Sequence, residues 1–387
     1  MRLRTVLLLH LLPVCLAAGL SAQEPPVPPA SPPILPEARL QCARGHLRAL
    51  MEARRLPGLS VAVGHRGQPV WAEAFGVADL TRGTLLTPAS VFPLGSTSKA
   101  LTSLALGKLV EEKKLDLDAP IQTYVPYFPQ KSHRITARLL AGHLSGLRDY
   151  DVQAGEYHNT RAFSSVQEAV GVFQDSPLLF EPGTKHAYSA YNFVLLSAAI
   201  EGASGEDFLT FMKTRVFTPL GLTQTGPDRR PVEMPGLVTC YLAGFGGIPI
   251  PASPTSVSNK WAAGGFVSTP SELVRVGNAL LRGEIVRPET FTLLTTPQKL
   301  KNGEDSGAHY GLGWRSGREK LPVSGREVQA VHHGGTAHGA MSFFVLFPED
   351  GLVVSLHTNL LVQPFTDFSK EAFYIADLFL GAEAACP

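Results

Sequence analysis

Strand-like sequence stands near both ends of this chain, and helical sequence fills the middle. Two apolar runs, 59–63 and 69–75, are separated by His65-Arg66-Gly67, which is typical of a β-hairpin. Two further strand-like runs, 342–347 and 352–356, come late in the chain. Because these strands must bury apolar faces in a shared core, the pattern predicts a sheet built from both chain ends, with a helical insertion between them.

Helices are expected beside the sheet and within the insertion. Pro36 suits the first position of a helix, and apolar residues recur at spacings of three and four until Pro57-Gly58 ends the run. A last helix is expected from about residue 369 to 380. In the insertion, apolar spacing predicts helices at 97–112, 137–144, 166–174, 191–202 and 206–215.

The N-terminus has the layout of a secretory signal. Arg2 and Arg4 precede an apolar stretch over residues 5–20, which ends in small residues. Pro13 and the short length disfavour a permanent membrane span, although an uncleaved anchor is the alternative. We therefore expect a signal peptide at 1–22 and a secreted or periplasmic protein without a membrane span once the signal is cleaved.

A proline-rich segment follows the signal. Residues 23–36 read QEPPVPPASPPILP, with seven prolines, and predict an extended polyproline-II linker. The folded domain is then expected over 37–387. Its sheet part would comprise about 37–95 and 260–387, and its helical part about 96–259.

The overall charge argues against a nucleic-acid partner. The chain has 34 Lys and Arg against 33 Asp and Glu, a formal net charge of +1, and no block of like charges. No Cys-x-x-Cys pair is present either, so no structural zinc site is expected. We expect no nucleic acid, no metal and no cofactor.

The cysteines allow one disulfide in the mature chain. Cys15 would leave with the signal peptide, whereas Cys42 and Cys386 stand near the two mature ends. In an oxidising compartment they could form a bridge and leave Cys240 free. Three unpaired thiols are the alternative.

The strongest local signal is Ser96 with Lys99. A serine at the start of a helix and a lysine three residues later lie on the same helix face, one turn apart. Serine needs a nearby base to act as a nucleophile, and a lysine whose pKa is lowered by burial can supply one. No other Ser-x-x-Lys spacing occurs among the 387 residues.

Several ordered segments extend this signal. They are FPLGSTSKALT at 92–102, RLLAGHLSGL at 138–147, FEPGT at 180–184 before Tyr188-Ser189-Ala190, AAGGFVST at 262–269, YGLGW at 310–314, and His333-Gly334-Gly335. Together they resemble class C β-lactamases, DD-peptidases and related esterases over about residues 38–380. The resemblance implies a serine β-lactamase/DD-peptidase-like fold of the α/β (α+β) class, with an antiparallel sheet flanked by helices.

The resemblance also implies roles for the site residues. Ser96 would attack a carbonyl, and Lys99 and Tyr188 would share the proton transfer, with either of them as general base. His333, Gly334, Gly335 and Thr336 would line the substrate strand. The oxyanion would lie between the backbone N–H groups of Ser96 and Thr336, and His333 would hydrogen-bond to Tyr188. A metal site at His332, His333 and His338 is a rival interpretation.

Two positions depart from the family pattern. Ala190 stands where the family usually has an asparagine, and Asn192 lies too far along to replace it. His333 stands in place of the lysine of Lys-Thr-Gly, so a fixed positive charge is missing there. Both departures favour esterase or peptidase activity over efficient β-lactam hydrolysis.

The predicted function is an exported serine hydrolase that forms an acyl-enzyme on Ser96. Its substrate would be a small molecule or a peptide, selected by loops at 153–160 and 222–260. A penicillin-binding or scaffold protein with slow or no turnover is the alternative, motivated by Ala190. The oligomeric state is left open.

Overall fold

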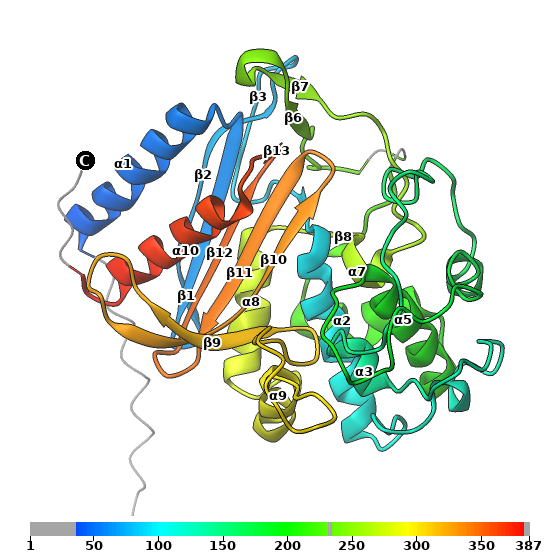
Figure 1. Cartoon of the computed structure of the whole chain (residues 1–387). Helices are drawn as coiled ribbons and strands as arrows, with labels where there is room; N and C mark the ends of the chain where they lie inside the picture. The colour runs from blue at the N-terminus through cyan, green and yellow to red at the C-terminus, as the bar shows by residue number, and fades with distance from the viewer. Residues whose placement is uncertain (1–35, 231, 233, 383–387) are drawn as a thin grey trace, which may run out of the picture. The chain divides into compact units, whose positions relative to one another are not determined.

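The computed structural model describes residues 36–230, 232 and 234–382, and within these ranges it contains a seven-stranded antiparallel sheet (Figure 1). The strand order is β3-β2-β1-β12-β11-β10-β9. The bounds are β1 Gly58–His65, β2 Gln68–Asp79, β3 Thr84–Leu85, β9 Arg315–Lys320, β10 Glu327–Ala337, β11 Ala340–Phe347 and β12 Leu352–Thr358. Early and late strands meet where β1 pairs with β12, with Val61 opposite Leu356. The prediction of one sheet built from both chain ends is confirmed.

Helices cover both faces of this sheet. Figure 1 shows α1 (Glu37–Arg54) and α10 (Phe365–Phe379) side by side over one face, and α8 (Pro270–Leu281) lies against β1 and β12 on the other. Successive side chains of a strand point to opposite faces, and accordingly Phe343 and Phe344 of β11 belong to different apolar clusters. Burial on both faces explains why residues 343–347 of β11 form an unbroken apolar run.

The middle of the chain is helical around a buried central helix, α2 (Ser98–Glu111). The remaining α-helices are α3 Ala137–Ala141, α4 Val166–Val170, α5 Ala190–Ser204, α6 Phe208–Phe211, α7 Trp261–Gly264 and α9 Pro288–Thr295. Short 3-10 turns are η1 Gly95–Thr97, η2 Ile121–Thr123, η4 Thr218–Leu220 and η5 Phe245–Gly247, and η3 Met212–Phe217 is a π-helical turn.

The described residues also form two small sheets. One contains β4 (Phe92–Pro93), β8 (Phe266–Ser268) and β5 (Gly226–Pro227). The other contains β13 (Leu360–Leu361), β6 (Tyr241–Ala243) and β7 (Pro249–Pro251). The pairing of β4 with β8 is relevant to the site, since it holds the segment just before η1 against the segment just after α7.

Most expected elements are present, with some shifted ends. The helix expected at 137–144 stops at Ala141, because His143 adopts a left-handed φ of 57° and turns the chain. The helix expected at 206–215 is wrong as a regular helix, since α6 ends at Phe211 and continues as the π-helical turn. The last helix begins at Phe365, earlier than expected. Helices α7, α8 and α9 were not predicted.

Some expectations fall on residues that the structure does not describe. The predicted signal peptide at 1–22 and nearly all of the linker at 23–36 lie outside the described residues, as does Cys386. Cys42 is disulfide-bonded, and Cys240 is buried and free. The Cys42–Cys386 pairing therefore stays a prediction. In the described part of the chain, no helix has the length and apolar character needed to cross a membrane.

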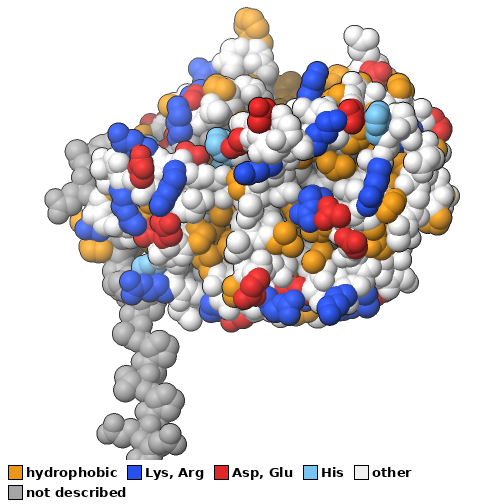
Figure 2. Space-filling model, turned by 60° about the horizontal axis from the view of Figure 1, so that its bottom comes forward, with side chains coloured by type: hydrophobic (Ala, Val, Ile, Leu, Met, Phe, Trp, Pro, Cys, Tyr) orange, Lys and Arg blue, Asp and Glu red, His pale blue; other side chains and the backbone are white. Residues whose placement is uncertain are grey.

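On the face shown in Figure 2, basic and acidic side chains alternate among hydrophobic and neutral ones. This face shows no patch of a single charge. A mixed surface of this kind matches the near-zero net charge of the chain.

Candidate active site

Ser96 lies in the 3-10 turn η1, and Lys99 follows in the first turn of α2. The Nζ atom of Lys99 is 3.3 Å from Oγ of Ser96 and donates to the carbonyl oxygen of Ala263 across 2.5 Å. Lys99 is 1% exposed. Burial lowers its pKa to about 7, and the negative charge of Asp149 acts in the opposite direction. Near neutral pH, Lys99 is therefore partly uncharged and able to accept a proton.

Strand β10 crosses directly over the turn that carries Ser96. A Cβ atom on Gly335 would lie 1.9 Å from the carbonyl oxygen of Leu94 and 2.9 Å from the backbone nitrogen of Ser96. Gly95 has a φ of +52°, and a Cβ there would lie 2.3 Å from the carbonyl oxygen of Thr336. Only glycine permits this approach. It brings together the two segments that carry the predicted oxyanion donors, the N–H groups of Ser96 and Thr336.

Tyr188 completes the group around the nucleophile. Its hydroxyl interacts with the Ser96 side chain, and Nζ of Lys99 lies 4.9 Å from the centre of its ring. Burial raises the pKa of Tyr188, while the interaction with Ser96 lowers it in part. The phenol is therefore protonated at neutral pH. The structure thus places Ser96, Lys99 and Tyr188 together.

His333 has partners other than the one expected. Its Nε2 pairs with the hydroxyl of Tyr310 across 2.9 Å, and its Nδ1 pairs with the carbonyl oxygen of Gly334 across 2.7 Å. Both ring nitrogens are thus engaged, so the expected hydrogen bond from His333 to Tyr188 is wrong. Burial, with the nearby Lys99 charge second, lowers the pKa of His333 well below its usual range. His333 is a neutral group at this site.

His143 is a further buried group beside the site that the sequence did not single out. Its ring centre lies 4.2 Å from that of Tyr188 and 4.7 Å from that of Tyr310. Burial, followed by the charge of Lys99, lowers its pKa well below its usual range. Both His143 and Tyr310 lie in segments that carried the family resemblance, RLLAGHLSGL and YGLGW. That resemblance was the only signal for them.

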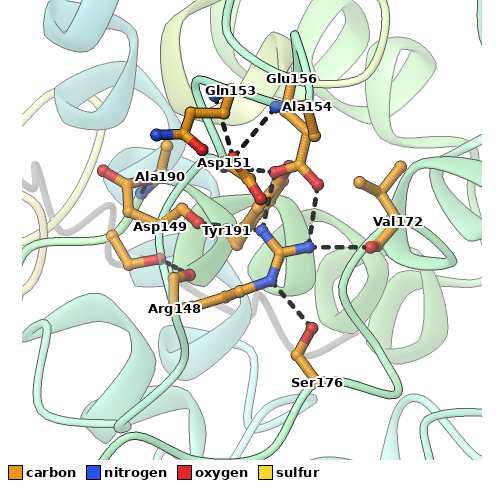
Figure 3. Close-up of polar contacts among 11 residues, drawn as sticks. Arg148, Asp149, Asp151, Gln153, Ala154, Glu156, Val172, Ser176, Ala190 and Tyr191 are labelled. Atoms are coloured by element: carbon orange, nitrogen blue, oxygen red, sulfur yellow. Dashed lines mark hydrogen bonds and ion pairs between the residues drawn. The ribbon is translucent and has the colours of Figure 1, made fainter.

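Because residue 190 is alanine, the site lacks the side-chain amide that the family's asparagine would supply at this position. Asn192 does not replace it, because its amide group is buried between His143 and Ser145, with Nδ2 3.0 Å from Nδ1 of His143. The group that reaches Ala190 is Asp149, whose Oδ1 accepts the Ala190 N–H across 2.8 Å (Figure 3). Asp149 was not predicted as a site residue.

Two cavities open on Ser96. One, of about 270 Å³, includes Lys99, Asp149, Tyr157 and Lys260 in its wall. The other, of about 490 Å³, is bounded by β10 and the start of α10. Tyr188 and Thr336 line both cavities. The nucleophile is therefore accessible from two sides, which suits a substrate that extends on both sides of the scissile bond.

The rival metal interpretation lacks a ligand set. Among residues 36–230, 232 and 234–382, no cluster of His, Cys, Asp and Glu could hold a metal ion. His332 contacts the ring of Phe343, whereas His338 pairs with Ser253 and stacks edge-on with His158. The three histidines therefore belong to different surroundings.

Several known proteins are similar to this chain. The Beta-lactamase family model matches residues 43–377. The human serine beta-lactamase-like protein LACTB, mitochondrial, is 28% identical over 87% of this chain and 81% of its own length. The teichoic acid D-alanine hydrolase of Staphylococcus aureus is 26% identical over 59% of this chain and 56% of its own length. A solved octameric penicillin-binding protein homologue from Pyrococcus abyssi superposes with a TM-score of 0.74 at 24% identity, covering 89% of this chain and 78% of its own.

The fold and the site define a serine hydrolase of the penicillin-recognising class. The chain belongs to the beta-lactamase family. The fold class predicted from the sequence is confirmed by the solved structures that resemble it.

Proposed function

We propose that this protein hydrolyses ester or amide bonds through an acyl group carried by Ser96. The main support is the position of Lys99, whose amine lies 3.3 Å from Oγ of Ser96. Burial lowers the pKa of this amine to about 7. Neutral Lys99 accepts the Ser96 proton while Oγ attacks the substrate carbonyl. The proton then passes to the leaving group, and a water molecule releases the acyl group by the same steps in reverse.

The two candidate bases differ in what burial does to them. Burial raises the pKa of Tyr188 and lowers that of Lys99. A phenol that stays protonated cannot begin the reaction as a base near neutral pH, whereas a partly neutral amine can. We therefore assign the base to Lys99. Tyr188, which lines the same cavities as Ser96, passes the proton toward the leaving group.

The oxyanion is assigned to the backbone N–H groups of Ser96 and Thr336. Support comes from the close crossing of β10 over η1, which requires Gly95 and Gly335. Fixed donors of this kind contribute on the order of 3 kcal/mol to lowering the barrier. They also need no rearrangement as the charge develops.

The substrate class follows from His333. A neutral histidine gives β10 no positive charge at the place of the Lys-Thr-Gly lysine. Substrates that depend on such a charge, such as penicillins, are therefore disfavoured relative to neutral esters and peptide amides. A relative named as a teichoic acid D-alanine hydrolase is compatible with ester substrates.

We also place the enzyme outside the cytoplasm. The support is the signal-like sequence at 1–22 and the disulfide at Cys42, since disulfides persist in oxidising compartments.

A penicillin-binding protein with slow turnover is the second candidate, favoured by Ala190 in place of the family's asparagine. The rate at which the acyl group is released from Ser96 distinguishes the two functions. An enzyme liberates nitrophenol continuously from a nitrophenyl ester, whereas a slow binder gives one burst equal to the amount of protein.

Labelling by a fluorophosphonate probe tests the nucleophile. The wild type is expected to gain one label per chain and Ser96→Ala none. Ser324→Ala, which changes an exposed serine in the turn before β10, serves as the matched control and should label normally. Equal labelling of Ser96→Ala and the wild type would refute the assignment.

A further inference from the structure

A carboxylate from a neighbouring loop stands beside the alanine at position 190. Oδ1 of Asp149 accepts the N–H of Ala190, the first residue of α5, across 2.8 Å. The helix start lacks a cap from Ser189, whose hydroxyl donates instead to the carbonyl oxygen of Arg148 across 2.6 Å. Two hydrogen bonds therefore tie residues 148–149 to the start of α5, directly after Tyr188.

The loop that carries Asp149 is itself firmly held (Figure 3). Arg148 forms a two-pronged pair with Glu156, with distances of 2.7 and 2.9 Å, and also donates to Ser176 across 2.8 Å. The hydroxyl of Tyr191 donates to Glu156 across 2.7 Å. Two-pronged arginine–carboxylate pairs fix geometry as well as adding stability. Asp149 is thus presented to Ala190 by a rigid cluster.

Asp149 also lines the smaller cavity together with Ser96 and Lys99. Its negative charge raises the pKa of Lys99 against the larger effect of burial. The other charged or titratable groups around this pair are Tyr150, Tyr157, Tyr188, His143, His333, His338, Lys260, Arg315, Asp228 and Arg230. Asp228 is paired with Arg230, so Asp149 is the acidic group whose charge acts on Lys99.

We propose that Asp149 is the positioning residue that compensates for the missing amide at position 190. Through the Ala190 N–H it fixes the start of α5, and with it Tyr188, against Ser96. Its carboxylate also supplies the negative charge that balances the Lys99 ammonium in the cavity. The proposal rests on the proposed function for its catalytic consequence, whereas its electrostatic part can be measured in the resting protein.

Two variants distinguish the effect of the hydrogen bond to Ala190 from the effect of the Asp149 charge. Asp149→Asn keeps an oxygen that can accept the Ala190 N–H but removes the charge, and Asp149→Ala removes both. Asp151→Asn is the matched control, because Oδ1 of Asp151 accepts the N–H groups of Gln153 and Ala154 within the same loop. All three use the full chain.

The first readout is the titration of Lys99 by NMR, with lysine Cε labelled with carbon-13 and the signal assigned by its loss in Lys99→Arg. Loss of a nearby negative charge destabilises the ammonium, so both Asp149 variants should show a Lys99 pKa lower by about half a unit or more. Asp151→Asn should titrate like the wild type. An unchanged Lys99 pKa in Asp149→Asn would overturn the proposal.

The second readout is the rate of fluorophosphonate labelling across pH. Asp149→Asn should keep most of the maximal labelling rate, and the pH at which its rate is half-maximal should be lower than in the wild type. Asp149→Ala should label at least about tenfold more slowly than the wild type, even at its own optimal pH. Labelling of Asp149→Ala at the wild-type maximal rate would also overturn the proposal. A wild type that does not label would refute the proposed function instead, and the NMR titration would still decide the role of Asp149.

Discussion

The hydroxyl of Tyr310 donates to Nε2 of His333 across 2.9 Å. Because Nδ1 of His333 faces the carbonyl oxygen of Gly334, which can only accept, Nδ1 carries the hydrogen and Nε2 is the acceptor. The ring is thereby fixed as one neutral tautomer. The residue that stands in place of the lysine of the Lys-Thr-Gly pattern is therefore a neutral group with both ring nitrogens engaged.

Removing the Tyr310 hydroxyl should cost stability. In Tyr310→Phe, the buried Nε2 of His333 loses its donor, which is expected to lower the free energy of unfolding by about 1–3 kcal/mol. Urea unfolding at neutral pH measures the difference. A variant as stable as the wild type would contradict the role of this hydrogen bond.

A methyl group at Gly335 should disable the oxyanion site. In Gly335→Ala, the new Cβ would lie 1.9 Å from the carbonyl oxygen of Leu94 and must push β10 away from η1. Labelling by the fluorophosphonate should fall by about 100-fold or more. Gly317→Ala on β9 is the control, since nothing lies within 4 Å of a Cβ there. Normal labelling of Gly335→Ala would show that the close crossing is not required.

Loss of the Tyr188 hydroxyl should slow proton transfer without unfolding the protein. Tyr188→Phe is expected to reduce nitrophenyl ester turnover by about 100-fold or more. Tyr124→Phe removes a hydroxyl that bonds only the backbone N–H of Asp116 and should leave turnover unchanged. Equal turnover in the two variants would exclude Tyr188 from the reaction.

Acid should destabilise the fold through its buried histidines. Burial lowers the pKa of His357 from 6.5 to about 3. Between about pH 3 and pH 6.5, His357 is therefore protonated in the unfolded chain but neutral in the folded chain. Acid thus stabilises the unfolded chain, and the free energy of unfolding falls as the pH falls. At pH 5 this residue alone accounts for a loss on the order of 2 kcal/mol.

Denaturant unfolding at pH 7 and pH 5 measures this effect. His357→Gln should lose less stability between the two pH values than the wild type, whatever its stability at pH 7. The exposed His133 gives the control variant His133→Gln, which should behave like the wild type. An identical loss in His357→Gln and the wild type would contradict the prediction.

Local sequence was sufficient to predict the centre of the site and most of the fold. Ser96 and Lys99 meet because they are one helical turn apart, and β1 with β2 could be read as a hairpin. Helix α8 carried readable signals that were missed. Thr269 caps the backbone N–H of Glu272, and Pro270 occupies the first helical position.

Contacts between distant segments could not be predicted in this way. Tyr310 and His333 are 23 residues apart, and Asp149 and Ala190 are 41 apart. Each pair meets only after the strands and helices have packed, and no periodicity in the sequence encodes that meeting. The expected hydrogen bond between His333 and Tyr188 was wrong for this reason, since Tyr310 takes the position beside His333.

The pH dependence of fluorophosphonate labelling tests most directly whether Lys99 activates Ser96. With a Lys99 pKa of about 7, the rate should rise about tenfold between about pH 6 and pH 8 and then level off. Lys99→Arg, which keeps a positive charge but cannot act as a base, should lose most of the rate and its pH dependence. A wild-type rate that does not change over this range, or that Lys99→Arg reproduces, would contradict the account.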